Sequence, residues 1–300
     1  MKLKKAFSSP YVLLPLLLLM WASLAAGSKT ALQAIDVHQY MFFTCLIAFV
    51  TFVLLVMLNK DARDDIKNIR KSDTLLLIIC GILVYLYYFL YNSALSIIDA
   101  TEASIINYTF PILIVVFDTI INRTRFTALK AVSLIIGLFG TIIIITGGNI
   151  LAFRLSDPAG ALLAFGAACS WALFSVLGRR PKGNLLLRNA IYMAICFVLA
   201  TLEILTLSQF ILPAPSTMLL IFWIGSFVMA ISTYIWFKIF NILSVSLVAN
   251  IAFITPFLTL CLIAIFLDET MTLAHVAGLA FILTAIAVQK IRSPDLKHKK

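Results

Sequence analysis

Long apolar segments separated by short polar ones follow one another along the whole chain. A helix needs roughly 20 mostly apolar residues to cross a hydrocarbon core of about 30 Å. The pattern therefore predicts ten membrane-spanning helices, near residues 10–28, 37–59, 74–97, 101–121, 128–147, 158–178, 186–208, 216–240, 245–267 and 272–291. Ser9-Pro10 and Asp157-Pro158 each place a capping residue before a proline, which is typical of a helix start.

The composition fits a protein whose solvent is lipid. Hydrophobic residues make up 62% of the 300 residues and charged residues 12%, whereas soluble chains have roughly half and a quarter. We therefore predict an all-α integral membrane protein. The formal net charge of +10 does not indicate nucleic-acid binding, because the basic residues lie in short clusters between apolar segments.

The cysteines all fall inside apolar segments. They are Cys45, Cys80, Cys169, Cys196 and Cys261. No two have the spacing of metal ligands, and none lies in a loop where a disulfide would form. We expect them to pack as small apolar side chains, and we expect neither a metal site nor a cofactor.

The basic residues predict the orientation of the helices. All but two of the 23 lysines and arginines fall on one side of the ten spans, and only Lys29 and Arg154 fall on the other. Cytoplasmic loops are enriched in these residues. We therefore expect a multi-pass protein of the inner membrane with both termini in the cytoplasm. A cleaved signal peptide is the alternative for the first segment, because lysines precede it and Ala22-Ser23-Leu24-Ala25-Ala26 resembles a cleavage region.

Two short patterns occur once in each half of the chain. They are Trp21-Ala22 then Lys29, which recurs 150 positions later as Trp171-Ala172 then Arg179, and residues 88–111, which recur 145 positions later as 233–256. Residues 1–150 and 151–300 would then hold five spans each. Because five is odd, the second half would enter the membrane upside down. Inverted repeats of this kind are typical of secondary transporters, with the substrate site at the repeat interface.

These motifs resemble those of the drug/metabolite transporter superfamily, specifically its EamA-like permeases. The resemblance covers nearly the whole chain. It rests on Trp-x7-Lys/Arg in the first helix of each half, on a proline midway along the fourth, and on Asp268-Glu269 before Gly278. It implies two inverted five-helix repeats around a central cavity, and transport by alternating access.

A shorter match is similar to the branch of that superfamily that exports aromatic and other amino acids. It consists of Glu102-x4-Asn107-Tyr108-x2-Pro111 and of Phe-Ile-Thr-Pro at 253–256. It implies export of aromatic or other hydrophobic amino acids, with other amphipathic metabolites or drugs as the alternative. Many members carry an arginine in the second helix, where this chain has Phe43-Thr44-Cys45. An anion-binding role for that helix is therefore in doubt.

Polar and aromatic side chains share helix faces in both halves. Spacings of three and four residues place Tyr85, Tyr88 and Asn92 on one face of the third helix. The offset of 145 carries this stripe to the eighth helix, with Thr233 and Phe237. In lipid, such side chains turn toward the bundle interior. They predict a shared central cavity, and a helix-packing seam is the alternative.

The prolines of the fourth and ninth helices suggest a polar site. Pro111 has no N–H, so the carbonyl of Asn107 loses its usual helix partner. That carbonyl and the side-chain amide could together hold an ammonium group. Pro256 frees another carbonyl, with Asn250 nearby. The alternative is that both prolines only kink their helices.

Trp21 and Trp171 lie well inside their helices rather than at the membrane interface, where tryptophan is usually found. Both could stack on an aromatic solute, or pack in the core. The full set of predicted substrate-binding residues is Trp21, Tyr85, Tyr88, Asn92, Asn107, Pro111, Trp171, Ser175, Thr233, Phe237, Asn250 and Pro256.

Few acidic residues lie within the spans. Asp118 precedes Arg123 by five residues, so we expect it near the inner interface, paired with Arg123 or Arg125. Glu203 lies fifteen residues past Arg188, toward the outer third of the seventh helix. Carboxylates in the membrane are candidates for carrying protons or charge, and an interfacial position is the alternative for both. We expect Glu203→Gln to leave transport largely intact.

Other classes of function lack their motifs. No Gly-x4-Gly-Lys-Ser/Thr loop supports ATP hydrolysis. His38, His275 and His298 are isolated, and no HExxH or paired-carboxylate motif occurs. We therefore expect no enzyme activity and no catalytic residue, and a sensor or scaffold is equally unsupported. The expected partners are a small-molecule substrate and the lipid bilayer, with no nucleic acid; a monomer is one option.

Overall fold

The part of the chain that the structure describes contains ten helical spans that are long and apolar enough to cross a membrane. The structure is a computed structural model and describes residues 9–152, 154–267 and 272–291. The spans are Pro10–Leu32, Val37–Leu58, Lys71–Ile97, Ala100–Asn122, Ala128–Ile145, Pro158–Leu177, Leu185–Leu207, Pro215–Phe240, Val245–Leu262 and Leu273–Lys290. They confirm the predicted all-α class and the number of spans. Asp268 and Glu269, part of the family motif, lie outside the described residues.

Six spans are single helices. They are α4 (Val37–Leu58), α6 (Lys71–Ile97), α9 (Ala128–Ile145), α10 (Pro158–Leu177), α11 (Leu185–Leu207) and α16 (Leu273–Ile291). Asp157 caps α10 as predicted, because its carboxylate accepts from the N–H groups of Ala159 at 2.7 Å and Gly160 at 3.0 Å. Ser9 stands at the cap position of the first helix, but its side chain makes no capping bond there.

Three spans are interrupted near their middle. They are the first, with α2 (Pro10–Ala22) and α3 (Leu24–Leu32), the fourth, with α7 (Ala100–Asn107) and α8 (Phe110–Asn122), and the ninth, with α14 (Val245–Ala252) and α15 (Thr255–Leu267). The last two breaks lie just before Pro111 and Pro256, which supply no N–H to the helix.

The eighth span differs from the ordinary helix that the sequence predicts. It runs from α12 (Pro215–Trp223) through the π-helix η3 (Ile224–Ile231) to α13 (Ser232–Phe240). Gly225, in η3, lies so close to α4 that an added Cβ would be 2.8 Å from the carbonyl oxygen of Thr44. Hydropathy does not register the change in helix type, because both helix types satisfy their own backbone hydrogen bonds.

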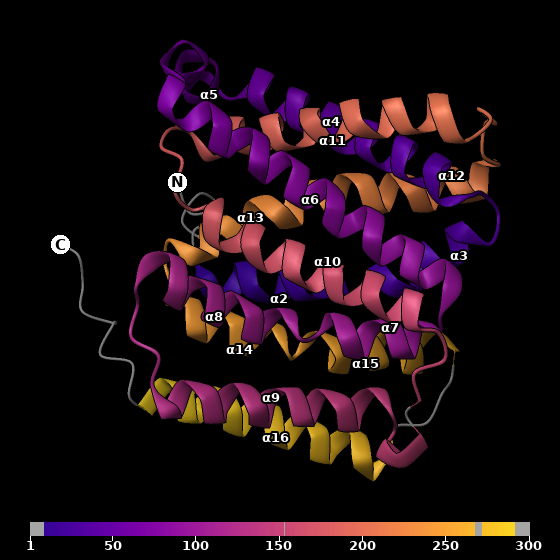
Figure 1. Cartoon of the computed structure of the whole chain (residues 1–300), viewed down its shortest axis with the longest axis vertical. Helices are drawn as coiled ribbons and strands as arrows, with labels where there is room; N and C mark the ends of the chain where they lie inside the picture. Colours follow the sequence, from indigo (N-terminus) through magenta and orange to yellow (C-terminus); the bar gives the residue numbers. More distant parts are fainter. Residues whose placement is uncertain (1–8, 153, 268–271, 292–300) are drawn as a thin grey trace.

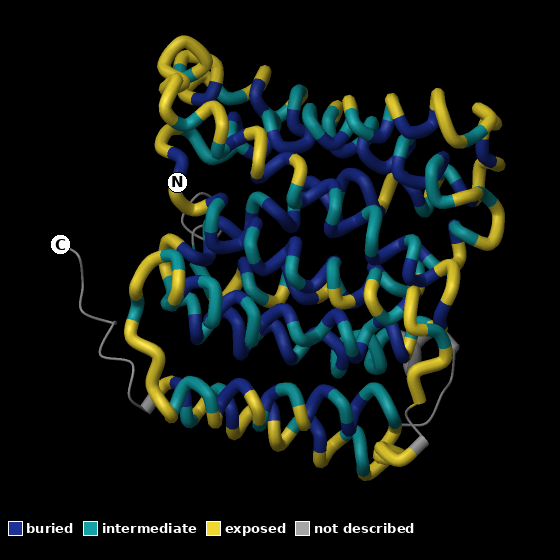
Figure 2. Tube along the Cα trace, in the orientation of Figure 1, coloured by how far each residue is buried: buried dark blue, intermediate teal, exposed yellow. Residues whose placement is uncertain are grey.

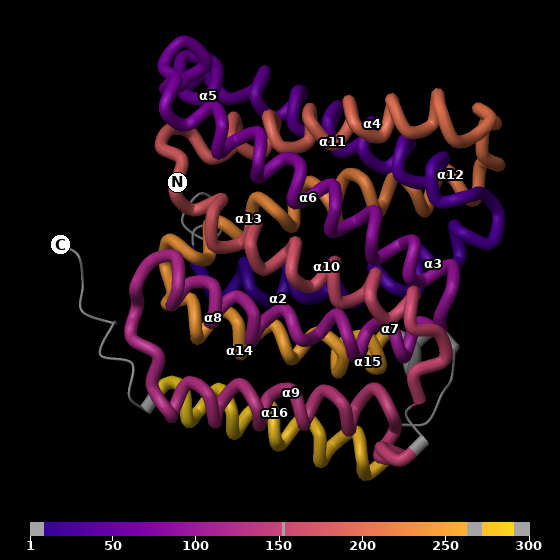
Figure 3. Tube along the Cα trace, in the orientation of Figure 1, coloured from indigo at the N-terminus to yellow at the C-terminus, as the bar shows by residue number. Residues whose placement is uncertain are grey.

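Pairs of helices far apart in sequence pack side by side. Helices α9 and α16 form one edge of the molecule, and α4 and α11 form the opposite edge (Figures 1 and 3). The backbones of α9 and α16 touch at two glycines: a Cβ on Gly140 would lie 2.6 Å from the carbonyl oxygen of Gly278, and one on Gly278 would lie 2.7 Å from that of Gly140. Small residues allow this close approach in membranes.

The connections between spans lie at two ends of the bundle. The short helices α5 (Lys60–Asp64) and η1 (Asp65–Asn68) lie at one end, which we call the α5 end (Figure 1). Helices α3 and α7 mark the opposite end, which we call the α3 end. The 3-10 turn η2 (Ile150–Ala152) follows α9.

The pattern of exposed and buried side chains is the one expected of a helix bundle that is surrounded by lipid. Buried positions concentrate on the inward sides of the helices (Figure 2). Large apolar side chains such as Leu162, Leu205 and Leu219 are more than two-thirds exposed, which suits contact with lipid chains. The cysteines pack inside the bundle, as expected for small apolar side chains. All five are free thiols: Cys45, Cys80 and Cys196 are buried, and Cys169 and Cys261 are partly buried.

Candidate substrate site

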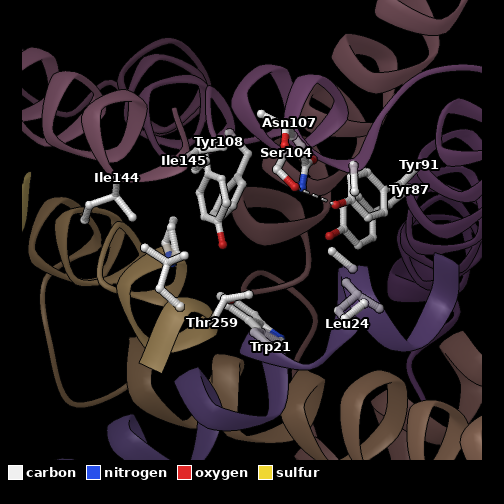
Figure 4. Close-up of a pocket in the computed structure, with 17 residues that line it drawn as sticks. Trp21, Leu24, Tyr87, Tyr91, Ser104, Asn107, Tyr108, Ile144, Ile145 and Thr259 are labelled. Carbon is white, nitrogen blue, oxygen red and sulfur yellow. Dashed lines mark hydrogen bonds between the residues drawn. The ribbon is translucent and has the colours of Figure 1, made fainter. Parts of the chain in front are cut away.

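A pocket of about 230 Å³ lies between helices of both halves (Figure 4). It reaches from the exposed residues Ala26 and Thr101 at the α3 end to the helix breaks in the middle of the bundle. Its lining consists of Trp21, Leu24, Ala25, Ala26, Tyr87, Tyr91, Ala100, Thr101, Ser104, Asn107, Tyr108, Phe110, Ile144, Ile145, Pro256, Thr259 and Leu260. None of these 17 residues carries a formal charge.

Aromatic rings form much of the pocket wall. Trp21 meets Phe110 edge to face, with ring centroids 6.3 Å apart. Tyr87 and Tyr91, one turn apart on α6, are stacked with centroids 6.1 Å apart. Tyr108 lies at the break between α7 and α8. Such surfaces favour the face of an aromatic or apolar group and can also attract a cation.

Trp21 joins the pocket to the other half of the chain. Its indole Nε1 donates to the Ser232 hydroxyl at 3.0 Å. Its ring lies 4.9 Å from that of Trp236 and 5.6 Å from that of Trp171, centroid to centroid. The ring is therefore held by partners from the second half while it lines the pocket.

Asn107 supplies the buried polar group of the pocket. The residue is 6% exposed, and its Oδ1 has no hydrogen-bond partner among the described residues. A buried acceptor without a partner costs free energy, and a site that binds a donor on its solute would satisfy it. The hydroxyls of Tyr91 and Ser104 lie 3.4 Å apart beside it (Figure 4).

Three of the predicted substrate-binding residues line this pocket, namely Trp21, Asn107 and Pro256. The polar residues of the predicted stripes instead bond to their own helices. Asn92 Nδ2 donates to the Tyr88 carbonyl at 2.6 Å, and Thr233 Oγ1 donates to the Met229 carbonyl at 2.6 Å. The polar side chains of these stripes on α6 and α13 therefore form a helix-packing seam rather than the wall of a cavity.

Three more predicted residues, Trp171, Ser175 and Phe237, are buried outside the pocket lining. Trp171 packs against Tyr87 with centroids 4.7 Å apart. Ser175 accepts from Trp236 Nε1 at 2.9 Å. Phe237 packs on Phe174.

On the two proline-broken spans, two further predicted residues lie outside the pocket. Asn250 donates to the Ser246 carbonyl at 2.9 Å. Pro111 is buried next to Phe110 at the start of α8.

Sequence reasoning missed several wall residues, chiefly Tyr87, Tyr91, Phe110 and Thr259. Tyr87 and Tyr91 are spaced by one turn, on the face of α6 next to the predicted stripe. Their i, i+4 spacing was a signal, but it does not tell which of two adjacent faces meets a cavity.

The expected partner of Asp118 is wrong. Asp118 Oδ1 accepts from Arg179 at 3.1 Å and from Asn122 at 2.8 Å, and Oδ2 accepts from Thr124 at 3.1 Å. Chain proximity favoured Arg123, but that residue ends α8 in the left-handed region, with φ 53°.

Arg179 reaches Asp118 because α10 packs along α8. The next residue, Arg180, binds the Ile121 carbonyl and Asn122 Oδ1, each at 2.8 Å. These contacts fasten α8 to the end of α10 at the α5 end of the bundle. We call the contacts of Arg179 and Arg180 with α8 the Asp118 lock.

Glu203 is buried between helices, four residues before the end of α11. It is 8% exposed. Its Oε2 accepts from the Tyr85 hydroxyl, and its Oε1 pairs with His38 Nδ1. Tyr85 therefore belongs to this cluster and not to the pocket. The expectation that Glu203→Gln leaves transport largely intact assumed an exposed carboxylate. Because the carboxylate is buried, that reason no longer holds.

The EamA-like transporter family matches the chain twice, at residues 8–146 and 158–289. An uncharacterized transporter of Bacillus subtilis, YvbV, is 28% identical over 95% of this chain and 93% of its own. The aromatic amino acid exporter YddG of Ancylobacter novellus is 32% identical over 31% of this chain and 33% of its own.

A crystal structure of another protein superposes with a TM-score of 0.77, covering 96% of this chain and 98% of the other. At 22% sequence identity it supports the fold alone. The two family matches, which span most of the chain, show that the chain belongs to the EamA-like transporter family.

Proposed function

We propose that this transporter exports amino acids with aromatic or other hydrophobic side chains. The observation that carries the proposal is the uncharged, aromatic-walled pocket with an unpaired amide oxygen at Asn107. The rings suit an apolar side chain, and Asn107 suits an ammonium group, which donates hydrogen bonds only. The partial match to an aromatic amino acid exporter supports the same class of solute.

The size of the pocket supports a small solute. Pockets for drug-sized ligands measure about 300–1,000 Å³, and this one is about 230 Å³. Other amphipathic metabolites or drugs are the alternative cargo. They would have to fit the same small pocket without using an ammonium group.

Reciprocal packing supports two inverted repeats, 1–150 and 151–300. The second span packs on the seventh (α4 with α11), the fourth on the ninth (α8 with α14), and the fifth on the tenth (α9 with α16). The pairing of α6 with α10 has its counterpart in α13 with α2. A pseudo-two-fold axis in the membrane plane would produce this pattern, and it underlies alternating access in secondary transporters.

The charge distribution supports an inner-membrane protein with cytoplasmic termini. The basic loops would then place the α5 end inside and the α3 end outside. The pocket opens at the α3 end, so this state faces outward. The Asp118 lock closes the opposite, cytoplasmic end.

We predict that Asp118→Ala shifts the protein toward the inward-open state. The substitution leaves Arg179 without its carboxylate and removes the acceptor of Asn122 and Thr124. In an Ile114→Cys background, the new thiol lies at a position that is buried on α8 one turn before Asp118, and it should react faster with an impermeant thiol reagent in inside-out vesicles. Asp61→Ala, in α5 at the same end, is the matched control. Equal labelling rates in the two variants would contradict the role of the lock.

A solute panel tests the proposed function. Purified protein in liposomes would be tested for counterflow of aromatic and aliphatic amino acids, their amides, N-acetylated forms, nucleosides and organic cations. We expect amino acids and their amides to move and N-acetylated forms to fail, because acetylation removes the ammonium group. Movement of organic cations without any amino acid would favour the drug-type alternative.

Enzyme activity within the membrane has less support than transport of either class of solute. The family and its full-length relative are transporters, and the proposed site needs no bond-breaking group.

A further inference from the structure

A buried acidic cluster lies apart from the pocket. Glu203 on α11 contacts Tyr85 on α6 and His38 at the start of α4. None of these three residues lines the pocket, and solute binding as proposed above does not use them. We call the three residues the Glu203 cluster.

The cluster holds one carboxylate between two different partners. The Tyr85 hydroxyl donates to Oε2, and His38 Nδ1 lies against Oε1. A phenol supplies a hydrogen bond but no countercharge, so His38 is the group that can neutralise an ionised Glu203. A buried charge without such a partner costs several kcal/mol, by order of magnitude.

His38 connects the buried carboxylate with the outer solution. Its side chain is 24% exposed, whereas that of Glu203 is 7% exposed. The His38 ring stacks on Phe89, which in turn stacks on Tyr85, with centroids 6.3 and 5.9 Å apart. The imidazole is thus fixed at the rim, and it is the side chain whose charge ordinarily changes between roughly pH 5 and 8.

Few other titratable groups face the cluster. Asp36 caps α4 beside His38. Burial raises its pKa, but hydrogen bonds from Ser208, Gln39 and the His38 N–H outweigh that and hold the pKa below its usual range. Asp36 therefore stays ionised at neutral pH. The thiols of Cys45 on α4 and Cys196 on α11 contact each other deeper in the bundle, and Cys45 lies within electrostatic reach of Glu203.

The elements around the cluster add little charge. Helices α12 and η3, which pack on α4, carry no titratable side chain. On α13, which packs on α11, Lys238 lies over the Tyr234 ring. Lys29 binds the carbonyls of Leu95 and Ile98 at the end of α6. The charged residues of α5 lie at the far end of α4.

We propose that the Glu203 cluster is a proton-binding site whose occupancy controls the transport cycle. With His38 protonated and Glu203 ionised, the pair holds one proton and is neutral. A second proton, taken from the outer solution by way of His38, forms an O–H bond on Glu203 Oε1. The pair then carries one positive charge, and its electrostatic attraction is lost.

This protonation acts across the two halves. His38 and Tyr85 belong to residues 1–150, and Glu203 belongs to residues 151–300. Loss of the ion pair weakens the connection of α11 to α4, so it favours conformations in which these helices are farther apart. A ligand that prefers one conformation shifts the equilibrium toward it, and here the ligand is a proton.

Infrared difference spectroscopy tests proton binding without any solute. Purified protein in liposomes would be acidified from roughly pH 8 to pH 5, the range in which histidine-linked groups titrate. We expect a carboxylic-acid C=O band to appear in the wild type and in Glu102→Gln, and to be absent in Glu203→Gln. Glu102 is the matched control because it is also buried, at 5% exposed, but is bound by Ser156.

The pH profile of counterflow tests the control of transport. We expect a wild-type rate that changes with outer pH by at most about tenfold per unit, the limit for one proton. The profile should be flat in Glu203→Gln and shifted in Tyr85→Phe, which keeps the ring and removes the hydroxyl. An unchanged band or an unchanged profile in Glu203→Gln would overturn the proposal.

The two readouts separate this proposal from the proposed function. Suppose that no solute of the panel moves, and that the carboxylic-acid band appears in the wild type but not in Glu203→Gln. Proton binding at Glu203 then stands, and the assignment of cargo fails. If amino acids move with a wild-type pH profile in Glu203→Gln, the cargo stands and the control by protons fails.

Discussion

Asn107→Leu is expected to lower amino acid flux by roughly 10- to 100-fold. Leucine has nearly the shape of asparagine, so the buried side chain keeps its packing and loses its amide. A hydrogen bond to a charged group contributes about 1.5–3 kcal/mol, and each 1.4 kcal/mol is about a factor of ten. Counterflow of a hydrophobic amino acid in liposomes measures the effect, with half-saturation and maximal rate determined separately.

Asn92→Leu is the matched control for that experiment. Asn92 is fully buried on α6, its Oδ1 also has no partner among the described residues, and its Nδ2 is bound to its own helix. It lies outside the pocket lining. We expect its flux to stay within a few-fold of wild type. A greater loss in Asn92→Leu than in Asn107→Leu would move the site toward the stripe that the sequence pattern favoured.

Gly278→Val is expected to prevent stable packing of α9 on α16. A Cβ at this position would lie 2.7 Å from the carbonyl oxygen of Gly140 and 3.2 Å from the backbone nitrogen of Ile144. These are backbone atoms, which cannot rotate away as a side chain can. Overpacking costs typically about 1–3 kcal/mol, and more when the backbone must shift. We expect a markedly lower melting temperature in detergent and a larger aggregated fraction on size-exclusion chromatography.

Gly166→Val provides the comparison for this substitution. Gly166 lies on α10, and the nearest atom to an added Cβ is the Leu90 Cδ1 methyl at 3.2 Å. A leucine end can change rotamer, so the strain there is relieved at low cost. Similar melting temperatures for the two variants would show that the glycine contact of α9 and α16 is not a tight constraint.

The sequence was sufficient for features that depend on local chemistry. A segment must be apolar over its whole length to lie in lipid, so hydropathy predicted the number and order of the ten spans. Pro111 and Pro256 lack an N–H wherever they occur, so the interruptions near them were predictable. The repeated Trp-x7-Lys/Arg motif indicated the family, and the family matches in both halves agree with that resemblance.

Only the tertiary structure decided which side chains meet. A helical period places Tyr85, Tyr88 and Asn92 on one face, but the rotation of α6 in the bundle directs the neighbouring Tyr87 and Tyr91 to the pocket. The partner of Asp118 is Arg179, which follows the end of α10 and is 61 residues away in sequence, rather than a residue of the adjacent loop.

The same distinction holds for Glu203, whose contacts lie 165 and 118 residues away. Hydropathy cannot tell a carboxylate at the interface from one buried between helices, because the flanking residues are apolar in either case. The sequence thus determined that the chain spans the membrane and where two of its helices break, whereas the break at Ser23 and the π-helix η3 have no such local signal. Packing between distant helices determined the pocket, the Asp118 lock and the Glu203 cluster, because each depends on how helices are rotated against one another.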